Sequence, residues 1–181
     1  MKIRLVKTGS VRFLLSFALL GIPAASVAQL SETAPPVKMG LWQTESTSTV
    51  TGLENTPMAA MAGRMGSGQT HKSQSCLTPE TWRKGIQGIN ERQRNGCTMS
   101  NMEQNAHEVS FDQVCDSGGG SKHTAHVHIL IDSDEHAHGT VVMKMEEPNF
   151  PQPVNINMNM TSQYLGSSCG DVKPGDGKVV H

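Results

Sequence analysis

The sequence predicts a mainly β domain with one helix: a single curved antiparallel sheet, or a partly open barrel, of about seven or eight strands. Three observations lead to this prediction. Short runs that are rich in Thr, Val and Ile, or that alternate apolar with polar residues, recur from residue 40 onward between clusters of Gly, Pro and Asn. One segment, near residues 78–89, carries helix start signals instead. Four cysteines follow a hydrophobic N-terminal leader, which predicts two disulfides.

The N-terminal hydrophobic segment, residues 1–28, has the layout of a secretory signal peptide. Its four basic residues precede a largely apolar run over 13–22, Pro23 ends that run, and small residues lead to a predicted cleavage site between Ala28 and Gln29. The run is too short to cross a bilayer, which takes about 20 apolar residues. We therefore expect cleavage, export to the periplasm and no stable membrane anchor.

The mature chain, residues 29–181, is acidic and lean in large apolar side chains. Ile, Leu, Val and Phe make up 24 of its 153 residues, and 11 Lys and Arg stand against 16 Asp and Glu, a net charge of −5 with His neutral. This thin apolar complement argues against a large multi-domain enzyme, a membrane-spanning protein and a coiled coil. The acidic balance argues against nucleic acid as a partner.

The first part of the mature chain predicts a leader and two strands. Residues 29–37 contain a Pro pair and predict a flexible leader. The Thr-rich segment 40–51 predicts the first strand, and 70–77 predicts a second strand that ends at Cys76. Between them, 53–69 is rich in Met, Ala and Gly and predicts either a mobile loop or a short helix. Such a helix would carry three methionines on one face: Met58, Met61 and Met65.

One helix is predicted from Thr78 to about Ile89. Thr78 suits the N-cap, Pro79 suits the first helical position, and Glu80 favours the positive end of the helix dipole. Apolar residues at helical spacing define a buried face made of Trp82, Ile86 and Ile89.

After the helix, the pattern predicts strands almost to the end of the chain. The predicted strands cover 97–103, 108–115, 124–131, 136–145, 154–160 and 162–165. The first four form two hairpins, separated by the glycine turn at 118–120. All these elements belong to one predicted domain over residues 38–169, which a flexible tail follows over 170–181.

The four cysteines, Cys76, Cys97, Cys115 and Cys169, all lie in the mature chain. They include no C-x-x-C pair, so disulfides are favoured over zinc binding. We favour Cys76–Cys97, which would close a local loop around the helix, and Cys115–Cys169, which would tie the C-terminal end to the middle of the sheet. The main alternative pairs Cys97 with Cys115 across a hairpin. Each bridge is expected to contribute about 3–4 kcal/mol through loop entropy.

A set of short motifs accompanies the four cysteines. The motifs are Gly40-Leu41-Trp42, Cys76-Leu77-Thr78-Pro79-Glu80, the GTVVMKM segment at 139–145, and Tyr164-Leu165-Gly166-Ser167-Ser168-Cys169. This set resembles a family of small exported bacterial proteins known only as a domain of unknown function, over roughly residues 37–170. The resemblance implies export to the periplasm and a disulfide-held domain, and it implies no activity and no catalytic residues. The sequence departs from the family pattern in its many His and Met residues.

Two H-x-H pairs lie close together in the second predicted hairpin. They are His126 with His128, and His136 with His138. Residues i and i+2 share one face of a strand, and burial of the apolar face of the hairpin selects a register that puts all four imidazoles on the other face. Imidazole clusters bind Zn(II), Cu(II) or Ni(II), so these four residues are a candidate metal site. A solvated polar face and a pH-sensing cluster are the alternatives.

Two M-x-M pairs, Met143 with Met145 and Met158 with Met160, have the same spacing. Their thioethers suit Cu(I). The register that gathers the histidines, however, places Met143 and Met145 on the core face, where Met commonly fills irregular gaps. We therefore expect core packing from these methionines.

The sequence contains no recognisable catalytic motif. We expect a non-enzymatic periplasmic protein with a binding or structural role, whose curved sheet offers an apolar pocket, lined by Trp42 and Phe111, to a small ligand or a periplasmic protein partner. A fully packed interior would count against this hypothesis. The alternatives are a periplasmic metal-binding protein that uses the His cluster, and the Met residues with it, and a secreted hydrolase of unrecognised type, which requires a nucleophile close to a base.

Overall fold

The computed structural model describes residues 29–54, 56, 59 and 68–180, and over these residues it confirms the predicted fold class. Eight strands form one open antiparallel sheet in the order β3-β4-β5-β6-β7-β1-β2-β8. The strands are β1 (Gly40–Thr51), β2 (Thr70–Leu77), β3 (Cys97–Gln104), β4 (Glu108–Gly118), β5 (Ser121–Ile131), β6 (His136–Glu146), β7 (Val154–Gly166) and β8 (Gly177–Val180). The helix α2 spans Pro79–Arg94. The predicted signal peptide, and the methionines Met58, Met61 and Met65, lie outside the described residues.

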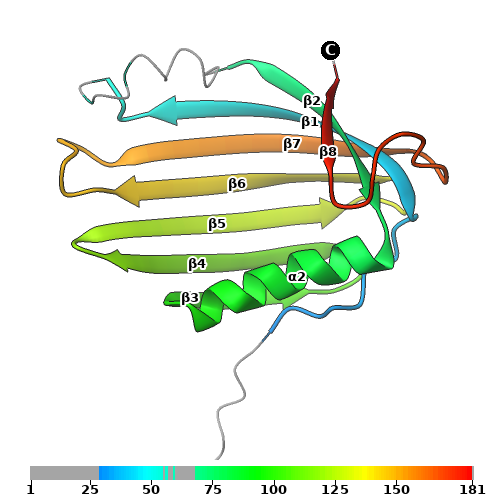
Figure 1. Ribbon diagram of the computed structural model, residues 1–181, viewed down its shortest axis with the longest axis horizontal. Coiled ribbons are helices and arrows are strands. Elements are labelled where there is room, and N and C mark those ends of the chain that lie inside the picture. The colour runs from blue at the N-terminus through cyan, green and yellow to red at the C-terminus, as the bar shows by residue number, and fades with distance from the viewer. Residues whose placement is uncertain (1–28, 55, 57–58, 60–67, 181) are drawn as a thin grey trace, which may run out of the picture.

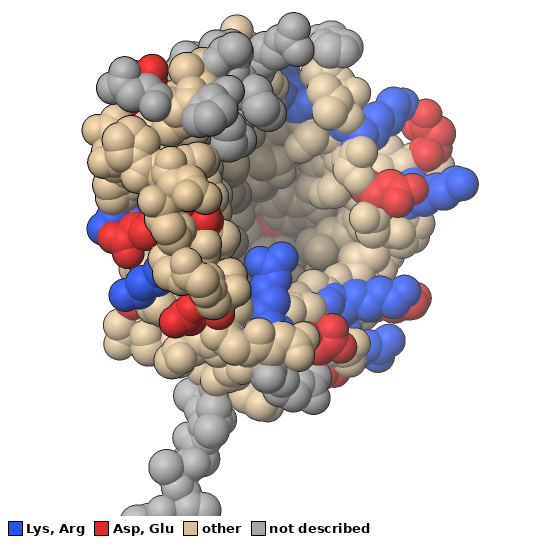
Figure 2. Space-filling view, turned by 60° about the vertical axis from the view of Figure 1, so that its left-hand side comes forward, with Lys and Arg blue, Asp and Glu red and all other residues tan. Residues whose placement is uncertain are grey.

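The sheet curls into a half-barrel that α2 partly covers. In Figure 1, strands β1, β7, β6, β5 and β4 form a curved wall, β8 crosses in front of this wall, and α2 lies in front of β3 and β4. Because α2 connects β2 to β3, it bridges two strands that lie near opposite ends of the sheet order. The space-filling view in Figure 2 shows that this arrangement leaves a hollow in the molecule.

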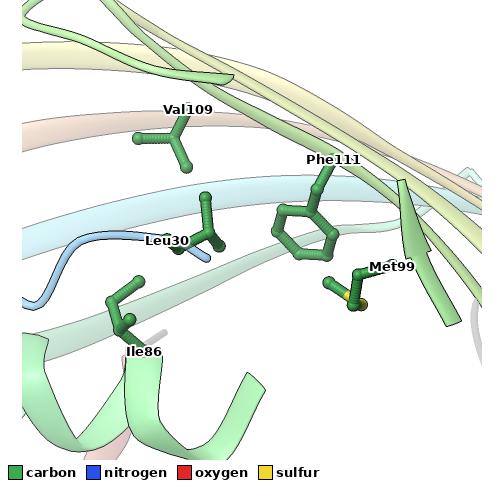
Figure 3. Packing of buried hydrophobic residues seen from close by; sticks show 5 residues of the cluster. All are labelled: Leu30, Ile86, Met99, Val109 and Phe111. Carbon is green, nitrogen blue, oxygen red and sulfur yellow. The ribbon is translucent and has the colours of Figure 1, made fainter. Parts of the chain in front are cut away.

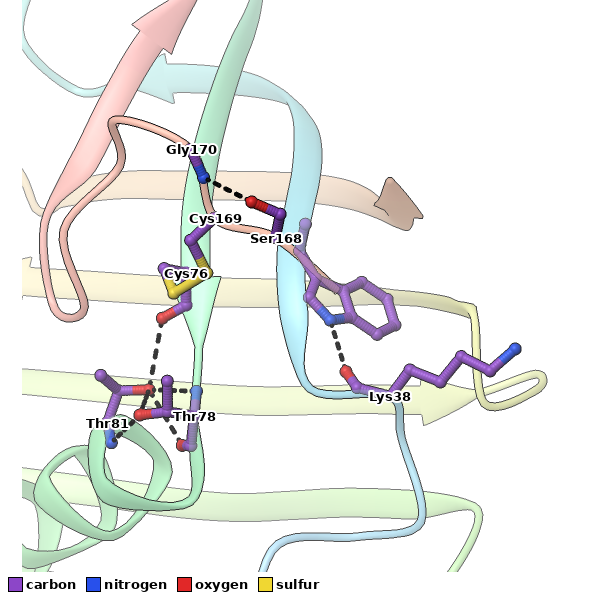
Figure 4. Close-up of a disulfide and its surroundings, with 8 residues drawn as sticks. Lys38, Cys76, Thr78, Thr81, Ser168, Cys169 and Gly170 are labelled. Carbon is purple, nitrogen blue, oxygen red and sulfur yellow. Dashed lines mark hydrogen bonds between the residues drawn. A yellow bond between two sulfur atoms is a disulfide. The ribbon is translucent and has the colours of Figure 1, made fainter. Parts of the chain in front are cut away.

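Helix α2 begins where the sequence predicts and ends one turn later than predicted. The Thr78 Oγ1 accepts a hydrogen bond from the Thr81 backbone N–H at 3.1 Å, and the Thr81 Oγ1 accepts one from the Thr78 N–H at 2.8 Å. This reciprocal capping box closes the N-terminus (Figure 4). The helix continues past Ile89 because no strong helix breaker occurs before Gly96, whose φ of +96° suits a helix end. Its last turn is mostly exposed, so the apolar pattern does not mark it.

The core consists of two small clusters. The first lies between α2 and the sheet and includes Ile86 of the helix and Phe111 and Val109 of β4 (Figure 3). Met99 of β3 and Leu30 complete this cluster. The second gathers Val50, Leu53 and Val154 where β1 ends and β7 begins.

The predicted flexible leader, residues 29–37, instead packs against the domain. Leu30 is only 4 % exposed and belongs to the first core cluster. The side chain of Gln104 accepts a hydrogen bond from the Ser31 N–H and donates to the carbonyl oxygens of Ser31 and Thr33. One apolar residue and one distant amide thus hold the segment in place, and neither contact is visible in its local composition.

The predicted flexible tail over 170–181 contains a further strand. Strand β8 pairs with the outer edge of β2 from Lys72 to Ser75, and Val172 is buried at 4 % exposure. The short GKVV segment lacks a clear strand pattern of its own. Its pairing arises because the edge of β2 has unpaired backbone groups and the preceding disulfide brings the tail close to them.

The favoured disulfide pairing, Cys76–Cys97 with Cys115–Cys169, was wrong. The bridges are Cys97–Cys115, the main alternative, and Cys76–Cys169. A 16-residue helix is about 24 Å long, so α2 holds Cys76 and Cys97 at its opposite ends. Cys97 instead lies directly opposite Cys115 in the β3–β4 pair. Cys169 follows β7, whose neighbour β1 pairs with β2, and it therefore reaches Cys76 with 5.5 Å between Cα atoms (Figure 4).

The two final strands predicted over 154–160 and 162–165 form one continuous strand, β7. Thr161 and Ser162, which break the apolar alternation, pair without interruption with β1 and β6. Neighbours on both sides supply the hydrogen bonds that maintain the strand through these polar residues.

Candidate ligand-binding site

Strand register separates the middle of the sheet into an apolar inner face and a polar outer face. Val127 of β5 lies opposite Val141 of β6, which in turn lies opposite Met158 of β7. Directly paired residues share a face, so odd positions of β5 and β6 and even positions of β7 point to the same side. This side faces α2, because Val127 and Ile129 line a cavity together with helix residues. The opposite side of β7 carries Asn155, Asn157 and Asn159.

The apolar side chains of the inner face are only partly buried. Those that are half-buried include Val127, Ile129, Val141, Met143, Met145, Ile156, Met158 and Met160. In a fully packed domain, residues of these types on a face covered by another layer lose nearly all contact with solvent. Their partial exposure on this side of the sheet means that the described residues leave space along it that they do not fill.

A cavity of about 430 Å³ occupies the space between α2 and the sheet. Trp82, Ile86 and Ile89 of α2 line one side of it, and Val127 and Ile129 of β5 line another. A second cavity of about 190 Å³ shares Trp82 and Ile129 with the first, so the two adjoin. Figure 2 shows that the walls of the hollow are mostly free of charged residues, while Lys, Arg, Asp and Glu gather at its rim.

The two residues predicted to line an apolar pocket both lie at these cavities. Phe111 lines the larger one, and Trp42 lines the smaller one. The Trp42 Nε1–H donates to the backbone oxygen of Lys38 at 2.8 Å, so the polar atom of the indole is satisfied and the ring lies against apolar neighbours. The structure therefore brings both residues to one hollow, at different positions within it.

A third cavity of about 180 Å³ adjoins the C-terminal end of α2. Arg92 of the helix lines it together with Gln113 of β4 and His123 of β5. Met143 and Met145 of β6 complete its apolar wall. Sequence reasoning missed Arg92 and Gln113, because nothing in their local pattern shows that the last turn of the helix lies over β4.

The four histidines of the predicted metal site share the outer face. His128 lies opposite Thr140, and His138 lies opposite Leu130, so all four occupy positions on the same side of the β5–β6 hairpin. Each of three imidazoles engages a different carboxylate: His126 contacts Asp112 at 2.5 Å, His128 contacts Glu108 at 3.0 Å, and His138 contacts Asp132 at 2.7 Å.

The His126 and His128 rings are 6.4 Å apart between centroids, and His136 contacts the Ser133 hydroxyl instead of a carboxylate. In the part of the chain that the structure describes, no three His, Cys, Asp or Glu side chains gather closely enough to hold a metal ion. The four histidines therefore lie along the hairpin as separate side-chain pairs.

Two of the His–carboxylate contacts perturb the acid. The hydrogen bond with His126, and a second from the Asn101 amide, hold the pKa of Asp112 below its ordinary value of 3.8. The hydrogen bonds with His123 and Ser121 lower the pKa of Glu147 in the same way. Both carboxylates are therefore ionised and engaged at neutral pH, Asp112 on the outer face and Glu147 beside the third cavity.

Comparison with known families identifies this architecture. The family model described as "Protein of unknown function (DUF3617)" matches residues 37–169. The chain belongs to this family. No curated protein and no solved structure showed a significant match. The DUF3617 match covers the sheet from β1 to β7, the helix and both disulfides, so it includes most of the residues that line the hollow.

Three of the four motifs that resemble the family meet at one end of the DUF3617 domain. Gly40 lies against the backbone of Gly166, where an added Cβ would come within 2.2 Å of the Gly166 oxygen. Trp42 packs against Tyr164, and Cys76 is bonded to Cys169. Motifs separated by 93 residues or more thus join β1, β2 and the end of β7, which indicates a structural role for them.

The two disulfides agree with an extracytoplasmic location for this DUF3617 protein, because structural disulfides persist in oxidising compartments. Over the described residues, no helix is both long enough and apolar enough to span a bilayer.

Proposed function

We propose that this DUF3617 protein is a periplasmic, non-enzymatic binding protein that holds a small hydrophobic molecule in the hollow between α2 and the inner face of the sheet. One observation carries the proposal: apolar side chains on the covered face stay half-buried around a cavity of about 430 Å³. Cavities of roughly 300–1,000 Å³ with mainly apolar walls are typical of sites for small molecules.

The energetics favour an apolar occupant. Each square ångström of apolar surface that leaves water contributes roughly 25 cal/mol, and the half-buried side chains of the hollow retain surface that a ligand would cover. Two disulfides and the capped helix hold the walls, so little ordering is needed on binding. The periplasmic location rests on the predicted signal peptide, residues 1–28, and on the disulfides.

Binding of Nile red, an uncharged dye that brightens in apolar surroundings, tests the proposal with the purified protein. We expect saturable binding, and we expect Val127→Gln to weaken it about tenfold, because a polar amide then enters the hollow. Val142→Gln is the matched control, since Val142 is 44 % exposed on the outer face of the neighbouring strand. Equal binding by all three proteins, or no saturable binding by the wild type, would refute the proposal.

Mass spectrometry of the protein purified from the periplasm gives a second test. A binding protein should release an intact apolar molecule on denaturation, and that molecule should stay chemically unchanged after long incubation with the protein. Conversion of the molecule into products would favour the alternative of a secreted hydrolase.

A further inference from the structure

Three cavities lie along β5, and the two outermost differ in chemistry. Alternate residues of β5 line the three cavities in succession: Ile131 and Ile129 line the smaller inner cavity, Val127 the largest, and Ala125 and His123 the cavity at the C-terminal end of α2. From Ile131 to His123 the strand extends about 27 Å. The end near Ile131 adjoins Trp42 and Val37, whereas the other end adjoins Arg92 and Gln113.

Arg92 is a cation without a carboxylate partner in the described part of the chain. No ion pair or hydrogen bond engages its guanidinium there, although it lines a cavity that is otherwise walled largely by uncharged side chains. Glu147, the acid that contacts His123 at this cavity, is already bonded by the His123 Nε2 at 2.8 Å and by the Ser121 hydroxyl at 2.5 Å. Arg92 therefore offers free donors at one end of the hollow.

Gln113 adds a buried polar group at the same place. Its side chain is 8 % exposed, and its Nε2 donates to the Cys115 Sγ at 3.2 Å, which is a weak acceptor. No other hydrogen bond of the Gln113 amide occurs among the described residues. Because no fully buried side-chain polar atom there lacks a partner, the Oε1 is accessible, and a group that enters the cavity can bond to the amide.

We propose that the ligand is a single-chain amphiphile with an anionic head: its head group contacts Arg92 and Gln113, and its apolar chain lies along β5 toward Trp42. This inference rests on the proposed function and specifies the ligand class. A guanidinium and an amide N–H are complementary to a carboxylate, which accepts charge-assisted hydrogen bonds. An extended hydrocarbon chain placed along β5 would run past the apolar side chains that line the three cavities.

Competition against Nile red tests the head-group contact, with dodecanoate and its uncharged counterpart dodecanol as probes near pH 7, where a carboxylate is ionised. Wild-type protein should bind dodecanoate more tightly than dodecanol. Arg92→Gln should weaken the binding of dodecanoate about tenfold and leave the affinity for dodecanol unchanged, because only the charged contact is lost. Arg83→Gln is the matched control: it removes the same charge from an exposed position of α2 that lines none of the three cavities.

A second variant, Gln113→Met, keeps the side-chain length and removes the amide. This substitution should weaken the binding of dodecanoate severalfold without weakening the binding of dodecanol. The head-group inference is overturned if both variants bind dodecanoate as tightly as the wild type does, or if they lose affinity for dodecanol to the same extent as for dodecanoate. Nile red binding by the wild type separates the two claims. If the head-group test fails and Nile red still binds, the proposed binding of an apolar molecule in the hollow stands. If Nile red does not bind at all, both claims are overturned.

Discussion

The indole ring of Trp42 meets the phenol ring of Tyr164 edge to face, with 5.9 Å between ring centroids and 65° between ring planes. The two residues are direct partners across β1 and β7, and the ammonium group of Lys38 lies 5.8 Å from the centroid of the Tyr164 ring. Such aromatic pairs contribute about 0.5–1.5 kcal/mol beyond their buried area. This contact links the first strand to the last strand of the DUF3617 domain at the end where the family motifs meet.

Replacing the Tyr164 ring should therefore destabilise the domain. We expect Tyr164→Leu to lower the free energy of unfolding by about 1–2 kcal/mol, because the edge-to-face contact and the cation–π contact are both lost. Urea unfolding followed by tryptophan fluorescence measures this change. Leu165→Ala, at a neighbouring position that is 46 % exposed, should change stability by less than about 0.5 kcal/mol, and equal effects of the two substitutions would contradict the prediction.

Gly40 is expected to tolerate no side chain. Its φ is +140°, and an added Cβ would come within 2.2 Å of the Gly166 backbone oxygen, so β7 would have to move. Gly40→Ala should lower the free energy of unfolding by roughly 2–4 kcal/mol. Gly88→Ala should instead raise it by about 0.5–1 kcal/mol, since Gly88 lies in α2 with open space around it. Chemical denaturation of both variants tests the contrast, and stabilisation by both would refute the steric argument.

The two disulfides should differ in their contributions to stability. Cys76–Cys169 closes a loop of 93 residues and Cys97–Cys115 a loop of 18. Loop entropy then predicts that the free energy of unfolding falls by roughly 4.7 kcal/mol in Cys76→Ser/Cys169→Ser and by roughly 3.2 kcal/mol in Cys97→Ser/Cys115→Ser. Urea unfolding under oxidising conditions measures both losses. A larger loss for Cys97→Ser/Cys115→Ser would mean that contacts outweigh loop entropy here.

The contribution of the Asp112–His126 contact to the stability of the fold should decrease at acidic pH. The pKa of Asp112 is lower in the folded protein than its ordinary value of 3.8, so the contact stabilises the fold above that value, and the contribution is lost as the pH falls through the lowered pKa. Asp112→Asn should cost about 0.5–1 kcal/mol near pH 6, because partly exposed ion pairs are weak.

The same measurement near pH 2 supplies the control for Asp112. As the pH falls toward this range, the carboxyl gains its proton in both states, and the difference in urea midpoint between wild type and Asp112→Asn should shrink. A difference between them that stays constant from pH 6 to pH 2 would show that the ionised carboxylate is not the source of the stabilisation.

Local patterns in the sequence were sufficient to predict most of the strands and the start of the helix. The Thr78-Pro79-Glu80 signal placed the start of α2 correctly, and the alternation in β5 and β6 led to the register that the strand pairing has. Both patterns depend on contacts within a few residues, either a cap or an i, i+2 repeat. Such contacts leave a direct trace in the order of residue types.

The candidate site was only partly predictable. Trp42 and Phe111 were expected at an apolar pocket on the curved sheet, and both do line a cavity. Arg92 and Gln113 were missed, because their importance depends on the last turn of α2 lying beside the inner face of β4 and β5. No periodicity of either segment records that placement.

By itself, the sequence determined most of the segments that form strands, where the helix begins, which face of the central strands is apolar, and that the four cysteines form disulfides. Tertiary structure alone decided which cysteines pair, that residues 177–180 add a strand to β2, and that the interior stays open beneath α2. The physical reason is the range of the interactions. Side-chain alternation and capping act between near neighbours, whereas the curvature of the sheet brings together Cys76 and Cys169, 93 residues apart, and sets how much space remains inside.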